Sequence, residues 1–133
     1  MEKKTHVLVV DDEQYITKLV ERTLEDAGYA VTVSNDGNSA LAMLAEKEPD
    51  LVLLDIRMPE LDGYQVLERL RESSDVPVLM LTAVHEKTAI AHSLGLGADD
   101  FIEKPFRPRV LVARIRAKLR RVRGELRHTN NVQ

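Results

Sequence analysis

A chain of 133 residues has room for a single domain, and it is long enough to bury most of the surface that its unfolded form exposes. Hydrophobic residues make up 44% and charged residues 31%, which excludes a disordered or fibrous protein, and the lack of cysteine excludes disulfides and a cysteine-based zinc site. The net charge is −3, and the longest apolar runs, VLVV and LVLL, are far too short for a membrane span, so we expect a cytoplasmic protein without membrane contact.

Five short segments of the chain have the composition of β-strands. Apolar runs lie at 7–10, 51–54 and 77–81, and weaker ones lie at 30–34 and 100–103. The segments between them repeat their apolar residues at helical spacing. The first three predicted helices carry Ile16, Leu19, Val20, Leu24 and Ala27, then Ala40, Leu41, Leu44 and Ala45, then Val66, Leu67 and Leu70.

The ends of the predicted helices have recognisable signals. Gly28 is expected to end the first helix, and a fourth helix is predicted to begin near His85 and to end around Gly95 and Gly97. Pro108 opens a fifth helix near 109–121. Strict alternation of strands and helices predicts an α/β fold: a doubly wound, five-stranded parallel sheet with helices on both faces.

The C-terminal part of the chain is strongly basic. Residues 104–133 hold 10 lysines or arginines against 1 acid, whereas residues 1–103 hold 9 against 21. Nucleic-acid binding is one interpretation. A solvated face is favoured, because Leu111, Ile115 and Leu119 repeat at helical intervals and require a partner surface. Residues 122–133 lack apolar periodicity and are predicted to be a linker or tail, which leaves 1–121 as the domain.

Polar residues gather at the carboxyl ends of the strands, where ligands bind in sheets of this kind. They are Asp11, Asp12, Asp55, Thr82 and Lys104. An Asp after a strand is most often a helix cap, and Asp11 or Asp12 can fill that role. Three carboxylates together with a hydroxyl and an ammonium favour a phosphoryl-transfer site that holds Mg²⁺.

The segments VLVVDDE, LVLLDIRMPELDGYQVL, VLMLTA and GADDFIEKPF resemble the receiver domain of bacterial two-component response regulators. The resemblance implies a flavodoxin-like fold with strand order 2-1-3-4-5. It also implies that Asp55 accepts a phosphoryl group from a sensor histidine kinase. The implied Mg²⁺ ligands are Asp11, Asp12, Asp55 and the backbone carbonyl of Arg57, with Asp11 acting mostly through water.

The same resemblance assigns the switch. Thr82, Ala83 and Lys104 would contact the phosphoryl oxygens, Phe101 would turn inward when the threonine moves, and Pro105 would follow a cis peptide bond. Arg57 and Val84 occupy variable positions that tune hydrolysis of the phosphoryl group.

The C-terminal segment further resembles the OmpR/PhoB-type subfamily, which implies a dimer on phosphorylation and control of a winged-helix DNA-binding domain absent from this chain. The implied dimer face holds Ile90, Leu94, Asp99, Asp100, Val110, Arg114 and Arg121. Ile90 and Val110 stand where that subfamily often has an ion pair, so a hydrophobic contact is expected instead.

Three alternatives remain open. The chain can be a stand-alone receiver that signals by protein contacts, or a receiver-like module that binds partners without phosphorylation. A phosphohydrolase of the haloacid-dehalogenase type also uses an Asp nucleophile and Mg²⁺. That family usually has a second acid two residues after its nucleophile, where this chain has Arg57. We therefore expect no enzyme beyond self-directed phosphoryl transfer and autodephosphorylation.

Overall fold

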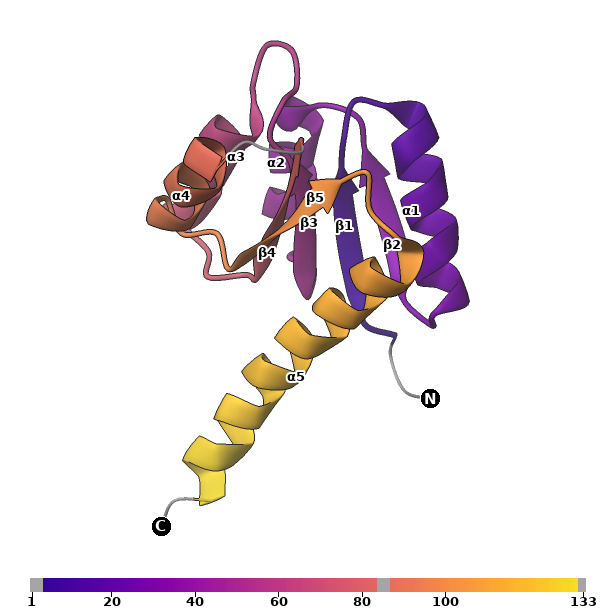
Figure 1. Cartoon of the computed structure of the whole chain (residues 1–133). Helices are drawn as coiled ribbons and strands as arrows, with labels where there is room; N and C mark the ends of the chain where they lie inside the picture. The colour runs from indigo at the N-terminus through magenta and orange to yellow at the C-terminus, as the bar shows by residue number, and fades with distance from the viewer. Residues whose placement is uncertain (1–3, 84–86, 132–133) are drawn as a thin grey trace.

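Strands and helices alternate from the first element to the last (Figure 1). The computed structural model describes residues 4–83 and 87–131, without the side chains of 87, 89 and 123–131. The elements are β1 (His6–Val10), α1 (Gln14–Asp26), β2 (Ala30–Ser34), α2 (Gly37–Glu46), β3 (Leu51–Asp55), α3 (Gly63–Arg71), β4 (Val78–Ala83), α4 (Lys87–Gly95), β5 (Asp100–Lys104) and α5 (Pro108–Asn131).

The five strands form one parallel sheet in the order β2-β1-β3-β4-β5. This confirms the predicted fold class and strand order. Strand β3 lies at the centre, and all five of its residues are buried. Its continuous apolar run follows from that position, because a central strand of a parallel sheet is covered on both faces.

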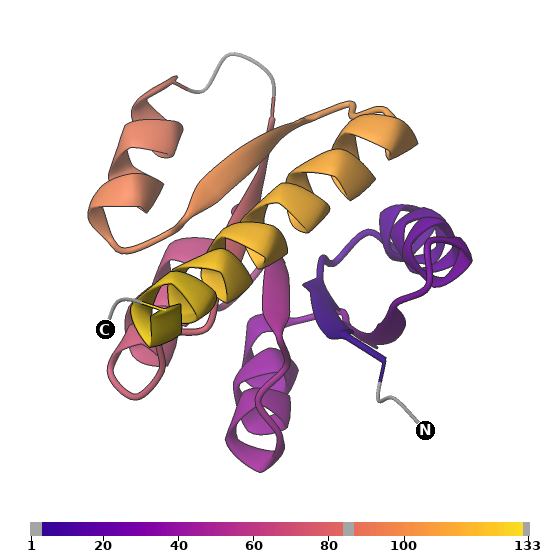
Figure 2. The same ribbon diagram turned by 90° about the horizontal axis from the view of Figure 1, so that it is seen from below.

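The helices cover both faces of the sheet, and the sheet divides the core into two layers (Figures 1 and 2). Leu53 lies in one cluster with Leu24 of α1 and Ile115 of α5. Its neighbour Leu54 points to the opposite face and lies in the other cluster with Leu67 of α3. Alternate residues of each strand therefore anchor different helices.

Local signals fix where several helices begin and end. The side chain of Asp36 accepts a 2.7 Å hydrogen bond from the Ser39 N–H at the start of α2. Asp62 and Gln65 form a reciprocal capping box at the start of α3. Gly28, which follows α1, has a φ of +99°. The prediction that this glycine ends the first helix is confirmed, because a positive φ favours a residue without a Cβ.

One helix end differs from the sequence prediction, and one predicted helix start cannot be compared with the structure. Helix α5 continues to Asn131 instead of ending near 121, and its last turns extend beyond the strands (Figure 1). Residues 122–131 contain no proline, and Gly124 is their only strong helix breaker, so nothing local stops the helix. The predicted helix start near His85 lies outside the described residues, as does Val84.

Helix α5 has 24 residues, but its charged side chains make it too polar to cross a bilayer. In the ranges that the structure describes, the other helices are not candidates for membrane spans either.

Candidate functional site

The predicted polar residues meet at the carboxyl edge of the sheet. Asp11 follows β1, Asp55 ends β3, Thr82 lies near the end of β4, and Lys104 ends β5. Because β1, β3, β4 and β5 are consecutive neighbours in the sheet, residues far apart in sequence lie at one corner. The parallel register pairs Asp55 with Leu81 and so brings the end of β3 beside Thr82.

Three carboxylates at this edge are arranged as a possible cation site. Asp11, Asp12 and Asp55 each offer an oxygen, and these oxygens lie within 4.8 Å of one another. Asp11 and Asp55 are buried, whereas Asp12 is exposed and leaves one side open to solvent. A hard divalent ion that keeps several waters fits this set, since Mg²⁺ takes few carboxylates and retains much of its hydration. The position of the Arg57 carbonyl as a further ligand stays a prediction.

Lys104 is the cation of the site. Its Nζ lies 2.9 Å from Asp11 Oδ2, 3.3 Å from Asp55 Oδ1 and 3.6 Å from Glu13 Oε1. Sequence reasoning did not single out Glu13, whose position just after the paired aspartates was the available signal. The lysine joins β5 to the ends of β1 and β3, but one ammonium among four carboxylates leaves the corner negative.

Burial and neighbouring charge set the protonation of this corner. Burial, then the charge of Asp11, raise the pKa of Asp55 to about 7 from the model-peptide value of 3.8, although Lys104 opposes the shift. For Lys104, burial alone would lower the pKa, but hydrogen bonds and charge from Asp11 and Asp55 outweigh it and the pKa is raised. Asp55 therefore lies where added positive charge is strongly favourable.

The structure shows where the remaining residues of the predicted switch lie. Thr82 is buried, and its hydroxyl donates a long, 3.4 Å hydrogen bond to the carbonyl of Ala83, which is exposed. Phe101 is half-buried against the core. The peptide bond between Lys104 and Pro105 is cis, the form that the resemblance implied. How these groups respond to phosphorylation stays a prediction.

The alternative role of Asp11 or Asp12 as the N-cap of α1 is not what the structure has. Glu13 occupies the N-cap position and makes no capping bond through its side chain. Asp11 Oδ1 instead accepts a 2.9 Å hydrogen bond from the backbone N–H of Glu13. That bond holds the Asp11 carboxylate in place while its other oxygen contacts Lys104.

Gly63 is a positioning residue that sequence reasoning did not single out. A Cβ added to it would overlap the carbonyl oxygen of Asp55 and lie 2.8 Å from the Cα of Ile56. Its N–H donates a 2.8 Å hydrogen bond to the Ile56 carbonyl. The start of α3 therefore rests directly on the chain that carries Asp55. The only sequence signal was a glycine after the helix-capping Asp62 in the segment LDGYQ.

The residues of the predicted dimer face fall into two groups. The side chains of Val110 and Leu94 are 42% and 45% exposed, Ile90 is partly buried, and Arg121 is exposed. The charged members next to them make contacts within the chain. Arg114 Nη1 donates to the Asp100 carboxylate at 3.2 Å.

Asp99 is held from three sides. It accepts from Arg71 of α3 at 3.2 Å and from the Val78 N–H of β4 at 2.7 Å, and it pairs with Lys118 of α5 at 2.9 Å. The resemblance offered no signal for Arg71 or Lys118. A role for Asp99 between two copies of the chain stays a prediction.

The family pattern described as "Response regulator receiver domain" matches residues 7–116 of this chain. Among curated proteins, a "Probable transcriptional regulator ycf27" from Guillardia theta is 50% identical over 121 residues, which cover 91% of this chain and 48% of that protein. The protein of the same name from Porphyra purpurea is 47% identical, over 90% of this chain and 49% of that protein. The chain thus spans about half the length of the curated relatives it matches.

Solved structures of response regulators are also similar to this chain. A putative response regulator from Chloroflexus aurantiacus is similar with a TM-score of 0.85 and 34% identity, over 88% of this chain and 98% of the other. The receiver domain of NtrX from Brucella abortus is similar with a TM-score of 0.82 and 35% identity, over 86% of this chain and 98% of the other.

Proposed function

The chain belongs to the response regulator receiver domain family, and from this we propose that its Asp55 accepts a phosphoryl group from a histidine of a sensor kinase. One observation carries the proposal: Asp11, Asp12, Asp55 and Lys104 meet in one corner whose charge balance calls for a divalent cation and can accommodate a phosphoryl group. Mg²⁺ is the cation that we assign to Asp11, Asp12 and Asp55, with the Arg57 carbonyl as a further ligand. It supplies positive charge against the incoming phosphoryl oxygens.

The transfer is a simple exchange of bonds. A carboxylate oxygen of Asp55 attacks phosphorus, the P–N bond to the kinase imidazole breaks, and the imidazole leaves with the electron pair and takes up a proton. Lys104 is already 3.3 Å from Asp55 and is placed to pair with a phosphoryl oxygen. The hydroxyl of Thr82, whose present hydrogen bond is long, and the backbone N–H of Ala83 are assigned to the others.

The product is a mixed anhydride, which water attacks at phosphorus to regenerate Asp55 and release phosphate. The phosphorylated form of the chain is therefore temporary. In this proposal the chain performs only self-directed phosphoryl transfer and autodephosphorylation. A hydrolase of the haloacid-dehalogenase type is disfavoured because Arg57, an exposed base, stands where that family has its second acid. A receiver-like module without phosphorylation would have no need for the shared carboxylates and Lys104.

We assign the output to the face that bears Ile90, Leu94 and Val110. Two of these apolar side chains are exposed within the single chain, and the Asp100–Arg114 ion pair lies on the same part of the fold. Movement of Thr82 toward the phosphoryl group, followed by Phe101, would change this face and favour a two-fold dimer. Asp99 and Arg121 complete the proposed contact.

The relatives are about twice as long as this chain and are named as probable transcriptional regulators. We therefore propose that the full regulator acts on transcription in the cytoplasm and contacts DNA through a winged-helix domain that these 133 residues do not include. A stand-alone receiver that signals through protein contacts is the second candidate.

Light scattering with beryllofluoride and Mg²⁺, a mimic of the phosphorylated state, tests this function. The wild-type mass should double as the mimic is added, whereas Val110→Asp should remain monomeric, because dimerisation would bury an unpaired carboxylate. We expect its dimer affinity to fall by at least about tenfold.

Ala42→Asp is the matched control, since Ala42 is exposed on α2, across the sheet from α5. It should dimerise like the wild type. Equal dimerisation of Val110→Asp and the wild type would remove the proposed face. No response of the wild type to the mimic would contradict the function itself.

A further inference from the structure

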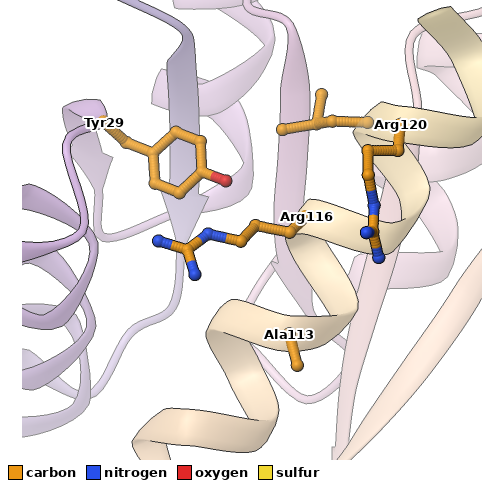
Figure 3. A pocket seen from close by; sticks show the side chains of 5 residues that line it. Tyr29, Ala113, Arg116 and Arg120 are labelled. Atoms are coloured by element: carbon orange, nitrogen blue, oxygen red, sulfur yellow. The ribbon is translucent and has the colours of Figure 1, made fainter.

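A second polar hollow lies far from the acidic corner. Tyr29, Ala113, Arg116, Leu119 and Arg120 line a cavity of about 480 Å³ between α5 and the turn that joins α1 to β2 (Figure 3). Tyr29 directly precedes β2, so this cavity opens at the amino edge of the sheet, whereas Asp55 lies at the carboxyl edge. Nothing in the proposed phosphoryl chemistry uses it.

The cavity carries two positive charges that no side chain in the described part of the chain pairs with. Arg116 and Arg120 are four residues apart on α5, a spacing at which like charges lie on one face and repel. Both are exposed, and neither has a side-chain ion pair or hydrogen bond among the residues that the structure describes. By contrast, Arg114 and Lys118 on other faces of the same helix each hold a carboxylate.

The remaining walls suit a ligand with an organic body. Tyr29 is half-buried, and its hydroxyl is directed toward the side of the cavity from which Arg116 reaches (Figure 3). Leu119 is buried and gives an apolar wall. Ala113, one turn before Arg116, fills little space. A volume of about 480 Å³ lies within the usual range for small-molecule sites.

A second hollow, between α1 and α5, adjoins this cavity, and the two together form one groove along α5. This second hollow has a volume of about 530 Å³ and shares Ala113 and Arg116 with the first cavity. Its charged residues are Arg116, Arg109 and Asp26, so one acid offsets one of its two bases. At the end near Tyr29, the lining residues that the structure describes include two arginines and no acid, so an anion is favoured there.

We propose that this cavity binds a small organic phosphate with a planar ring, of the nucleoside-monophosphate class. Guanidinium groups bind phosphate oxygens through paired hydrogen bonds. The Arg116 guanidinium lies beside Tyr29, and the exposed side chain of Arg120 would turn toward it to supply the second positive charge (Figure 3). The ring of the ligand would stack on Tyr29, as bases stack on aromatic side chains in proteins that bind single strands. The site is independent of Asp55 and does not rest on the proposed phosphorylation.

Calorimetric titration of the full chain with AMP tests the proposal, with EDTA present so that no metal bridges the nucleotide to the acidic corner. At about 0.15 M salt, which screens non-specific attraction, AMP should bind saturably. Inorganic phosphate should bind about tenfold more weakly, because it cannot stack on Tyr29. Arg116→Gln and Arg120→Gln should each weaken AMP binding by about tenfold.

Two further variants make the result specific. Tyr29→Leu should weaken binding of AMP by about fivefold or more and leave binding of inorganic phosphate unchanged. Arg69→Gln removes the same charge from α3, on the opposite face of the sheet, and should bind AMP like the wild type. Unfolding midpoints of all variants show that each is folded.

Absence of saturable AMP binding below about 5 mM, or equal affinity in the wild type and both arginine variants, would overturn the site. So would a loss in Arg69→Gln as large as in Arg116→Gln, since the binding would then follow net charge alone.

Discussion

Asp55 is only 5% exposed and shares its corner with the buried carboxylate of Asp11. Both facts make its negative charge unfavourable, and Lys104 offsets them only in part, which leaves its pKa at about 7. The charged form of such a carboxylate is stabilised by any added cation. Asp55 is therefore well placed to react in the presence of bound Mg²⁺. The cost of keeping it charged without metal can be measured.

We predict that Asp55→Asn stabilises the metal-free protein in a pH-dependent way. The pKa of Asp55 is raised in the folded state, to about 7 from 3.8, so folding is favoured while the group is protonated. That stability is fully present below pH 4 and is lost as the pH rises through 7. Asn does not titrate, so the variant should match the wild type near pH 4 and exceed it by up to about 4 kcal/mol at pH 8.

Urea unfolding in EDTA between pH 4 and pH 8 measures this difference. Excess Mg²⁺ at pH 8 serves as the control, because an ion bound to the ionised carboxylate should stabilise the wild type and reduce or reverse the gap. A gap that is the same at pH 4 and pH 8 would show that burial does not shift the pKa of Asp55 as described.

The residues of the acidic corner could be predicted from the sequence because each directly follows or ends an apolar strand. Asp55 after LVLL and Lys104 after DFIE are examples, and a parallel sheet places such ends together. Gly63 and Arg71 could not be predicted in the same way. Their roles depend on backbone atoms that lie close only after folding: the Asp55 carbonyl for Gly63, and the Gly97 carbonyl for Arg71.

At the scale of the elements, the positions of α3 and β3 depend on one another. The first residue of α3 rests on the backbone of Asp55, and the capping box of Asp62 and Gln65 fixes the direction in which the helix leaves. The position of the Asp55 carboxylate thus depends on the absence of a side chain at Gly63.

Gly63→Ala should therefore move α3 away from β3. Its new methyl group cannot coexist with the Asp55 carbonyl oxygen, and we expect a loss of about 1–3 kcal/mol in the free energy of unfolding, together with weaker Mg²⁺ binding. Chemical denaturation and a Mg²⁺ titration followed by NMR measure the two effects.

Gly95→Ala is the matched control. A Cβ at Gly95 meets nothing within 4 Å, and its φ is not in the positive range, so the same change in α4 should be neutral or slightly stabilising. If Gly63→Ala were as stable as Gly95→Ala, the close approach of α3 and β3 would have no consequence.

The length of α5 is where sequence reasoning about elements failed. Apolar periodicity ends near Val122, and the prediction ended the helix with it. Periodicity reports the face that packs on the sheet, whereas the helix itself continues to Asn131 through residues that include glutamate, leucine and arginine, which favour helix. The end of the packed domain and the end of the helix therefore lie at different positions in the chain.

At the scale of the whole molecule, the sheet and its two layers of helices are complete before the last turns of α5. Leu119 is the last buried side chain within residues 90–122, and the turns that follow extend past the strands (Figure 1). We accordingly propose that the receiver domain ends near Arg121 and that residues 122–133 lead away from it.

A chain that ends after Arg121 should then keep its fold. We expect the free energy of unfolding to change by less than about 1 kcal/mol, because the shorter chain keeps Leu119 and every other side chain that the structure describes as buried. Urea denaturation of the two chains makes the comparison. A loss of several kcal/mol would mean that residues 122–131 belong to the packed domain.

The proposed function depends on Asp55 as the residue that carries the phosphoryl group. Its most direct test is incubation with acetyl phosphate and Mg²⁺, followed by intact mass measurement of the wild type and Asp55→Asn. The wild type should gain the mass of one phosphoryl group and lose it after the donor is removed, while Asp55→Asn should gain none. An equal gain of mass in both proteins would show that Asp55 is not the phosphoryl acceptor.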